Sequence, residues 1–233
     1  MTTYMDQLYR DSGLIAVLFS GGLDSAVLLA QAARTATVQP LYVSVGLAWE
    51  SQERETADRL LASPPFRTNV RPMSILHMDM RDVYPPSHWA IRGEAPAFDT
   101  PDEDVYLEGR NIVLLSKASV FMARAKISRV LIGPLAGNPF PDASATFFDA
   151  MGGALSIGLA APIIIEAPFA AMHKSDVIRL GESLGVPFEL TLSCMQPSNG
   201  RHCGRCSKCR ERRDAFVEAR IDDPTSYAVK PIR

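Results

Sequence analysis

The sequence predicts an α/β fold: a doubly wound parallel sheet with a small metal-binding knuckle at its C-terminal end. Continuous apolar runs alternate along the chain with amphipathic segments, and this pattern indicates strands buried on both faces between covering helices. A glycine-rich loop joins the first apolar run to the first helical segment, and all four cysteines lie near the C-terminus. With 233 residues, 47% of them hydrophobic, the chain is long enough to bury one large core.

Each expected strand is a short apolar run, and each expected helix is a longer segment with its apolar residues on one side. Strands are expected at 14–19, 40–46, 70–77, 129–133 and 161–166. Helices are expected at 24–34, 51–62, 111–125, 145–157, 174–184 and 209–219. Residues 80–108 differ, because four prolines and several acidic residues interrupt any period. They predict a long loop, either a substrate lid or a mobile stretch of surface.

The loop after the first expected strand is the most specific local signal. It consists of Ser20, Gly21, Gly22, Leu23, Asp24 and Ser25. The two glycines leave room for an anion against the main chain, and the first amides of the following helix carry the positive end of its dipole. The serine hydroxyls add donors, and Asp24 can hold magnesium against phosphate oxygens. The loop predicts a pyrophosphate site; the alternative is a turn that only joins strand to helix.

The spacing of this loop separates it from two better-known phosphate loops. It lacks the Lys-Ser/Thr pair of a Walker loop and the third glycine of a Rossmann fingerprint. It resembles instead the PP-loop of the N-type ATP pyrophosphatases, which cleave ATP between its α and β phosphates. This resemblance implies an adenine nucleotide alpha hydrolase-like fold and an enzyme that uses ATP and Mg²⁺.

The cysteines predict a metal site. Cys203, Cys206 and Cys209 follow C-x2-C-x2-C spacing, and Cys194 lies nine positions before them. Four thiolates this close can converge on one Zn²⁺ ion, although an iron–sulfur cluster is a competing interpretation. The first six residues lack the basic start and apolar core of a signal peptide, so we expect a cytoplasmic protein with reduced thiols rather than disulfides.

Together these motifs resemble the 7-cyano-7-deazaguanine synthase family of queuosine biosynthesis. Between the PP-loop and the cysteines, Arg110-Asn111 resembles the family's Arg-Asn motif, and Phe140-Pro141-Asp142 resembles its Tyr-Pro-Asp segment. Residues 173–178 resemble its Thr-Lys-x-Glu-Ile segment, and 190–194 resemble Leu-Thr-Trp-Ser-Cys. The likeness runs from about residue 14 to residue 227. It implies a PP-loop domain over 1–190 and a four-cysteine zinc-binding segment over 191–233 that packs on it.

The resemblance also implies a reaction. The family is a ligase that converts 7-carboxy-7-deazaguanine and ammonia to 7-cyano-7-deazaguanine through an adenylated carboxylate, releasing AMP and pyrophosphate. Catalytic roles then fall to Asp24, Lys174 and Arg110, with Lys174 facing the phosphates and Asn111 beside the nucleotide. Phe140 and Asp142 are candidate acceptor ligands, since a carboxylate can accept from the guanine-like edge. Simpler interpretations are a surface lysine for Lys174, helix capping for Asn111 and a turn residue for Asp142.

The chain departs from the family pattern near the expected acceptor pocket. Residues 46–53 replace a Tyr-Gly-Gln-x-His element, 142–144 replace Asp-Cys-Arg, and 135–138 replace an Asn-x-x-Asp stretch. The resemblance therefore supports adenylation more strongly than the identity of the acceptor. A paralogue that adenylates and amidates another carboxylic acid is the main alternative.

Charge and composition limit the partners. The net charge of −2 gives no general footprint for nucleic acid, and no apolar run is long enough to cross a bilayer. A basic stretch over 201–220 is interpreted as a solvated or nucleotide-facing surface rather than a nucleic-acid site. We expect no membrane and no nucleic-acid partner, and the family resemblance implies a homodimer. A tRNA sulfur-transfer enzyme and a non-enzymatic nucleotide sensor remain the rival classes.

Overall fold

The computed structural model describes residues 13–231, so the N-terminal residues used to judge a signal peptide lie outside it. Its centre is a five-stranded sheet in the order β3-β2-β1-β4-β5 with every pair parallel. The strands are β1 (Leu14–Leu18), β2 (Thr37–Ser44), β3 (Ser74–His77), β4 (Arg129–Leu131) and β5 (Ile164–Glu166). This order is that of a doubly wound sheet and confirms the predicted fold class.

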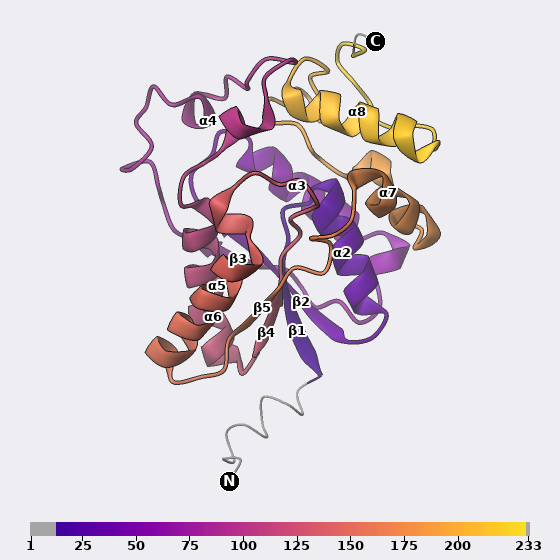
Figure 1. Cartoon of the computed structure of the whole chain (residues 1–233). Coiled ribbons are helices and arrows are strands. Elements are labelled where there is room, and N and C mark those ends of the chain that lie inside the picture. The colour runs from indigo at the N-terminus through magenta and orange to yellow at the C-terminus, as the bar shows by residue number, and fades with distance from the viewer. Residues whose placement is uncertain (1–12, 232–233) are drawn as a thin grey trace.

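Helices cover both faces of the sheet (Figure 1). They are α2 (Leu23–Ala33), α3 (Glu50–Leu61), α4 (Trp89–Arg92), α5 (Arg110–Ala125), α6 (Ala145–Leu159), α7 (Lys174–Ser183) and α8 (Ser207–Ala219). α5 packs with α6 on one side, whereas α2 packs with α7 on the other, and α7 in turn contacts α8. Each expected helix and strand is present, with ends shifted by a few residues. None of the described helices is long and apolar enough to span a bilayer.

The start of β3 shifts most, from residue 70 to Ser74, and β2 begins at Thr37 rather than at residue 40. The strand passes through Pro40, a residue that normally marks a strand edge because it cannot donate to the ladder. The side chain of buried Gln39 donates to the Pro40 and Pro72 carbonyl oxygens at 3.1 and 2.9 Å. Side-chain hydrogen bonding therefore supports the backbone where the proline interrupts the ladder.

The core divides into three clusters. One lies between the sheet and α2, α7 and α8, and a second lies under α5 and α6. The third lies at the carboxyl ends of β1 and β2 and joins Val43 and Val45 to the buried cysteines Cys194, Cys206 and Cys209. The C-terminal segment therefore shares a core with the sheet instead of forming an independent unit.

Residues 80–108 are packed against the C-terminal segment rather than free of it. They contain α4 and a 3-10 turn at Asp102–Val105 (η2), and Tyr84, Ala90, Val105 and Leu107 are buried in the third cluster. Arg210 of α8 donates to the carbonyl oxygens of Phe98 and Thr100 at 2.7 and 3.1 Å. Figure 1 shows this segment beside α8 at one end of the sheet. Helix α8 thus fixes the segment over the carboxyl ends of the strands.

Candidate functional site

The glycine-rich loop connects β1 to α2 at the point where the strand order reverses, between β1 and β4. Gly21 has φ +76°, and a side chain there would bring a Cβ within 3.2 Å of the backbone of Glu53 and Ala57. Its carbonyl oxygen accepts from the Leu192 amide at 2.9 Å. Only glycine fits this position, and the loop is held between α3 and the segment before the cysteines.

The loop leaves the start of α2 open to ligands. Gly22 is the N-cap and has no side chain to cap the first amides, while Ser25 Oγ donates back to the Gly22 carbonyl oxygen at 3.0 Å. The Gly22 amide donates to Ser20 Oγ at 3.3 Å, which fixes that hydroxyl beside the loop. Free amides at a helix N-terminus bind anions, so the local geometry suits a phosphate group.

Asp24 and Lys174 lie 150 residues apart in sequence but form an ion pair at this loop. Lys174 Nζ, at the start of α7, is 3.0 Å from Asp24 Oδ2 and 2.7 Å from Glu211 Oε1 of α8. Lys208 Nζ then contacts Glu211 Oε2 at 2.7 Å. The sequence analysis singled out Asp24 and Lys174, whereas Glu211 and Lys208 were seen only as part of a basic stretch. No local pattern reveals their contact, because it depends on how α8 packs on α7.

The charges of this network depend on one another. Burial alone would lower the pKa of Lys174, but the carboxylates of Asp24 and Glu211 outweigh it and raise that pKa. Burial alone would raise the pKa of Glu211, but Lys174 and Lys208 lower it to about 2. Asp24 Oδ1 is buried and has no hydrogen-bond partner among the described residues. A buried, unpaired carboxylate oxygen beside the glycine-rich loop fits a divalent cation such as Mg²⁺.

Two cavities open beside the loop. The first, of about 300 Å³, extends over the ends of β1 and β2 and is lined by Tyr42 and Glu50 among others. The second, of about 350 Å³, extends toward the cysteines and is lined by Lys174, Lys208 and Glu211 among others. Both are lined by Ser20, Gly22, Asp24, Trp49, Glu53, Arg110, Gly133, Pro134, Asn138 and Phe140. The two cavities therefore meet at the glycine-rich loop and at Arg110.

Glu53 is a cavity residue that sequence analysis did not single out. Its carboxylate accepts from Tyr42 Oη at 2.8 Å and from Trp49 Nε1 at 3.1 Å. Burial raises the pKa of Glu53 to about 7, even though these hydrogen bonds oppose the shift. The neighbouring Glu50 is also buried and accepts from the Val45 and Gly46 amides, which fixes the end of β2. The segment 46–53, where the chain departs from its expected family, thus forms a wall of the first cavity.

Asp142 occupies a different place from the one expected of an acceptor ligand. Its carboxylate accepts from the Asn111 backbone amide at 3.1 Å, and Asn111 Nδ2 donates to the Asp142 carbonyl oxygen at 2.9 Å. Asp142 is buried, and of this pair only Asn111 lines the first cavity. Phe140, stacked on Tyr106 with ring centroids 4.9 Å apart, lines both cavities. Asp142 therefore positions Asn111 at the start of α5 instead of facing the cavities.

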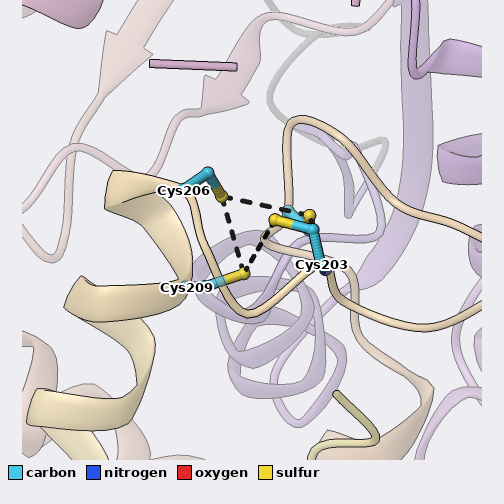
Figure 2. Close-up of side chains that lie close together, drawn as sticks. Cys203, Cys206 and Cys209 are labelled. Atoms are coloured by element: carbon cyan, nitrogen blue, oxygen red, sulfur yellow. Dashed lines mark hydrogen bonds between the residues drawn. The ribbon is translucent and has the colours of Figure 1, made fainter. Parts of the chain in front are cut away.

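The four cysteine side chains converge, and their sulfur atoms all lie within 4.8 Å of one another. Cys194 Sγ is 3.9 Å from Cys206 Sγ, and Cys203 Sγ is 3.8 Å from Cys209 Sγ. Figure 2 shows Cys203, Cys206 and Cys209 pointing toward one another from the loop and the start of α8. Tetrahedral Zn²⁺ with bonds of about 2.3 Å places its sulfurs about 3.8 Å apart, which matches these distances.

The surroundings of the sulfurs also suit thiolate ligands. Backbone amides of Gln196, Cys203, Gly204 and Arg205 lie 3.2–3.4 Å from cysteine sulfurs and donate to them. Such donors stabilise the negative charge of metal-bound sulfur. His202 is not needed as a substitute ligand, since its Nε2 accepts from the Ser193 amide at 3.1 Å. The predicted ligand set is therefore brought together as a group that can hold a metal.

Comparison with known proteins assigns a family to this arrangement. The family model described as queuosine biosynthesis protein QueC matches residues 15–220. A 7-cyano-7-deazaguanine synthase of Methanoculleus marisnigri is 34% identical over 216 residues, covering 90% of this chain and 96% of that protein. One of Anaeromyxobacter dehalogenans is 32% identical over 222 residues, covering 91% and 94%.

A more distant likeness is found among solved structures. U34-tRNA thiolase NcsA from Methanococcus maripaludis aligns with a TM-score of 0.48 at 12% identity, covering 97% of this chain and 83% of that one. That similarity is too low to inform the activity of the present chain.

Proposed function

This chain belongs to the family of the queuosine biosynthesis protein QueC, and from that premise we propose that it is a 7-cyano-7-deazaguanine synthase. In this proposal it is a ligase that uses ATP and ammonia to convert 7-carboxy-7-deazaguanine to the 7-cyano product. The observation that carries the proposal is the Asp24–Lys174 pair at the open start of α2, beside two cavities that meet there. Phosphate groups and an acceptor can occupy such adjoining cavities at the same time.

Different groups at and around the loop would bind different parts of the nucleotide. The open amides at the start of α2 would hold the β and γ phosphates, and Lys174 would neutralise the charge that develops on departing pyrophosphate. Asp24, with Oδ1 unpaired, would hold Mg²⁺, which when bound offsets the same charge. Arg110, which lines both cavities, is placed to contact either the α-phosphate or the acceptor carboxylate.

Glu211 acts in this proposal as a positioning residue. One of its carboxylate oxygens accepts a hydrogen bond from Lys174 and the other accepts one from Lys208. Glu211 therefore fixes the direction of the Lys174 side chain. Because its pKa is held near 2, Glu211 stays charged at every physiological pH. Helix α8 thereby links the cysteine cluster to the phosphate-binding loop.

The proposed reaction needs no nucleophile from the protein. The substrate carboxylate attacks the α-phosphorus of ATP, forming an acyl adenylate and releasing pyrophosphate. Ammonia then displaces AMP and gives the amide. A second ATP activates the amide oxygen, and loss of AMP with the amide protons leaves the nitrile. All four cysteines lie in one cluster, so none is free to serve a glutaminase reaction, and ammonia must come from solution or a partner.

We propose a structural role for the cysteine cluster. Cys194, Cys203, Cys206 and Cys209 would hold Zn²⁺ in a closed site, which leaves no open coordination position for chemistry. The ion would hold the C-terminal segment and the start of α8 against the sheet. A cytoplasmic location would keep the four thiols reduced and available as ligands.

A second candidate is a paralogue that adenylates a different carboxylic acid. It is favoured by the position of residues 46–53 and 135–138, where the chain departs from the family pattern, since both stretches line the cavities. The test is release of AMP and pyrophosphate from purified protein with ATP, Mg²⁺, ammonium and a panel of acids. We expect turnover with 7-carboxy-7-deazaguanine, whereas turnover with only an unrelated acid would establish the paralogue.

A further inference from the structure

Asp102 is an unpaired carboxylate in the second cavity. It begins the 3-10 turn η2 and lines the cavity together with the PP-loop and Lys208. Its Oδ1 is buried and has no hydrogen-bond partner among the residues that the structure describes. Leaving a buried carboxylate oxygen unpaired is costly, so such an atom in a cavity points to a ligand that supplies the missing donors.

The other carboxylates at the cavities already have partners. Glu53 accepts from Tyr42 and Trp49, Glu211 binds two lysines, and Asp24 Oδ2 binds Lys174. Asp142, the residue first expected to recognise a purine edge, accepts from Asn111. Among the carboxylates that line the described cavity walls, Asp102 is therefore the one whose side chain makes no hydrogen bond to another described residue.

The wall of the same cavity suits a flat aromatic ligand. Trp49 and Trp89 both line it, and their rings stack with centroids 5.8 Å apart and an interplanar angle of 11°. Val105, Leu107 and Met195 add apolar surface. A heteroaromatic ring gains stacking and apolar burial against such a wall, whereas a hydrated metal ion would gain neither.

Positive charge also lines this cavity. Arg110, Lys174 and Lys208 contribute cationic groups, and Asp102 contributes an acceptor. A ligand that fits both must be planar, carry N–H donors on one edge and bear a negative group elsewhere. A 2-amino-pyrimidinone ring fused to a carboxylate-bearing ring has this combination.

We propose that Asp102 is a specificity-determining residue that accepts hydrogen bonds from the ring N–H and the exocyclic amino group of the acceptor. This inference rests on the proposed function, because it takes the acceptor to be a 7-deazaguanine carboxylate. Asp102 selects the acceptor by pairing with two adjacent donors, and the carboxylate of the acceptor lies toward the cationic groups. The residue takes no part in transferring the adenylyl group.

Binding measurements test this assignment directly. Equilibrium binding to the full chain is measured by calorimetry for 7-carboxy-7-deazaguanine, for the same compound without its 2-amino group, and for ATP. The variants are Asp102→Asn and a matched control, Asp104→Asn, which alters an exposed aspartate of the same turn. An asparagine presents a donor to one of the two ligand donors, so it breaks the bidentate pair without changing size.

We expect Asp102→Asn to weaken binding of the deazaguanine by about 10- to 100-fold, in the range for losing one bidentate contact. Binding of the compound without the amino group should change by less than about 3-fold, because it has one donor for the remaining oxygen. ATP binding and the Asp104→Asn variant should match wild type.

Equal loss for both acceptors, no loss, or a changed requirement for Mg²⁺ would overturn the role of Asp102. These outcomes are separable from failure of the proposed function. If the wild-type chain binds the deazaguanine with the expected Asp102 dependence but releases no AMP, the reaction is wrong and the recognition stands. If it releases AMP while Asp102→Asn binds normally, the recognition is wrong and the reaction stands.

Discussion

Among single residues, Asp24 is the side chain on which the proposed reaction depends most. One of its oxygens binds Lys174, and the other is buried at the glycine-rich loop without a partner among the described residues. One oxygen of Asp24 therefore makes a structural contact, whereas the other is left for a ligand. Replacing Asp24 by asparagine keeps the size of the side chain and an oxygen that can contact Lys174. It removes the negative charge that a bound cation would need.

Asp24→Asn is expected to lower kcat by about 100- to 1,000-fold, the typical effect of removing one preorganised electrostatic contact. The fold should persist, because the amide oxygen can still accept from Lys174. Steady-state AMP release and a thermal melt measure the two effects. Asp58→Asn, which changes an exposed aspartate of α3, is the matched control. Wild-type turnover in the Asp24 variant would mean that the loop does not act on ATP.

Glu211 gives a prediction for the pH dependence of stability. Its pKa is about 2 in the folded chain against an ordinary value of 4.5, so its charge stabilises the fold above pH 4.5, and this contribution is lost as pH falls toward 2. Glu211→Gln should remove this slope and lower the free energy of unfolding at pH 7 by about 1–2 kcal/mol, after allowance for partial exposure.

Urea unfolding between pH 2.5 and 7 measures that slope for wild type and variant. Glu218→Gln, an exposed position on the same helix, should keep the wild-type slope. If the Glu211 and Glu218 variants show the same pH dependence, the Lys174–Glu211–Lys208 network does not stabilise the fold.

Sequence patterns predict site residues when the residues are close along the chain. The glycine-rich loop and the four cysteines stand out in the sequence because glycine conformation and ligand spacing are local properties, and the structure brings the four cysteines together. Glu53, Glu211 and Asp102 were not identified, since their contacts come from packing between distant segments. Asp142 has a residue type that suits a purine edge, but its contact with Asn111, 31 positions away, takes up its carboxylate.

At the scale of elements, the strands and main helices follow directly from hydrophobic period. The structure of segment 80–108 does not follow from hydrophobic period, because its prolines interrupt that period. The segment contains a short helix and a 3-10 turn, and Arg210 of α8 holds it in place. Helix α8 therefore organises more of the molecule than its length suggests. It carries Cys209, the buried Arg212 and Glu211, and it connects the cysteines, segment 80–108 and Lys174 beside the glycine-rich loop.

Removing one cysteine tests the role of this element. Cys206→Ser should lower metal content and stability together, by more than about 4 kcal/mol, because structural zinc contributes folding free energy directly. Elemental analysis should find about one zinc per chain in the wild type and little in the variant. Ser198→Ala, an exposed change in the same segment, should retain both metal and stability. Iron with acid-labile sulfide in the wild type would replace the zinc assignment.

At the scale of the whole molecule, the two expected segments, 1–190 and 191–233, do not have separate cores. Cysteines of the second pack with Val43 and Val45 of the first, and the third cluster closes the carboxyl end of the sheet. This arrangement places the segment that carries the four cysteines next to the cavities. The sequence predicted that the segments pack together, but not that segment 80–108 would complete the shared core, because its burial depends on tertiary contacts.

We propose that the chain adenylates the carboxylate of a 7-deazaguanine. The most direct measurement follows oxygen-18 from the labelled carboxylate of 7-carboxy-7-deazaguanine during turnover with ATP, Mg²⁺ and ammonium. Each adenylation transfers one carboxylate oxygen to AMP, so we predict that both labelled oxygens end in AMP, one in each of the two molecules formed per nitrile. Unlabelled AMP, or label in inorganic phosphate released with ADP, would contradict it.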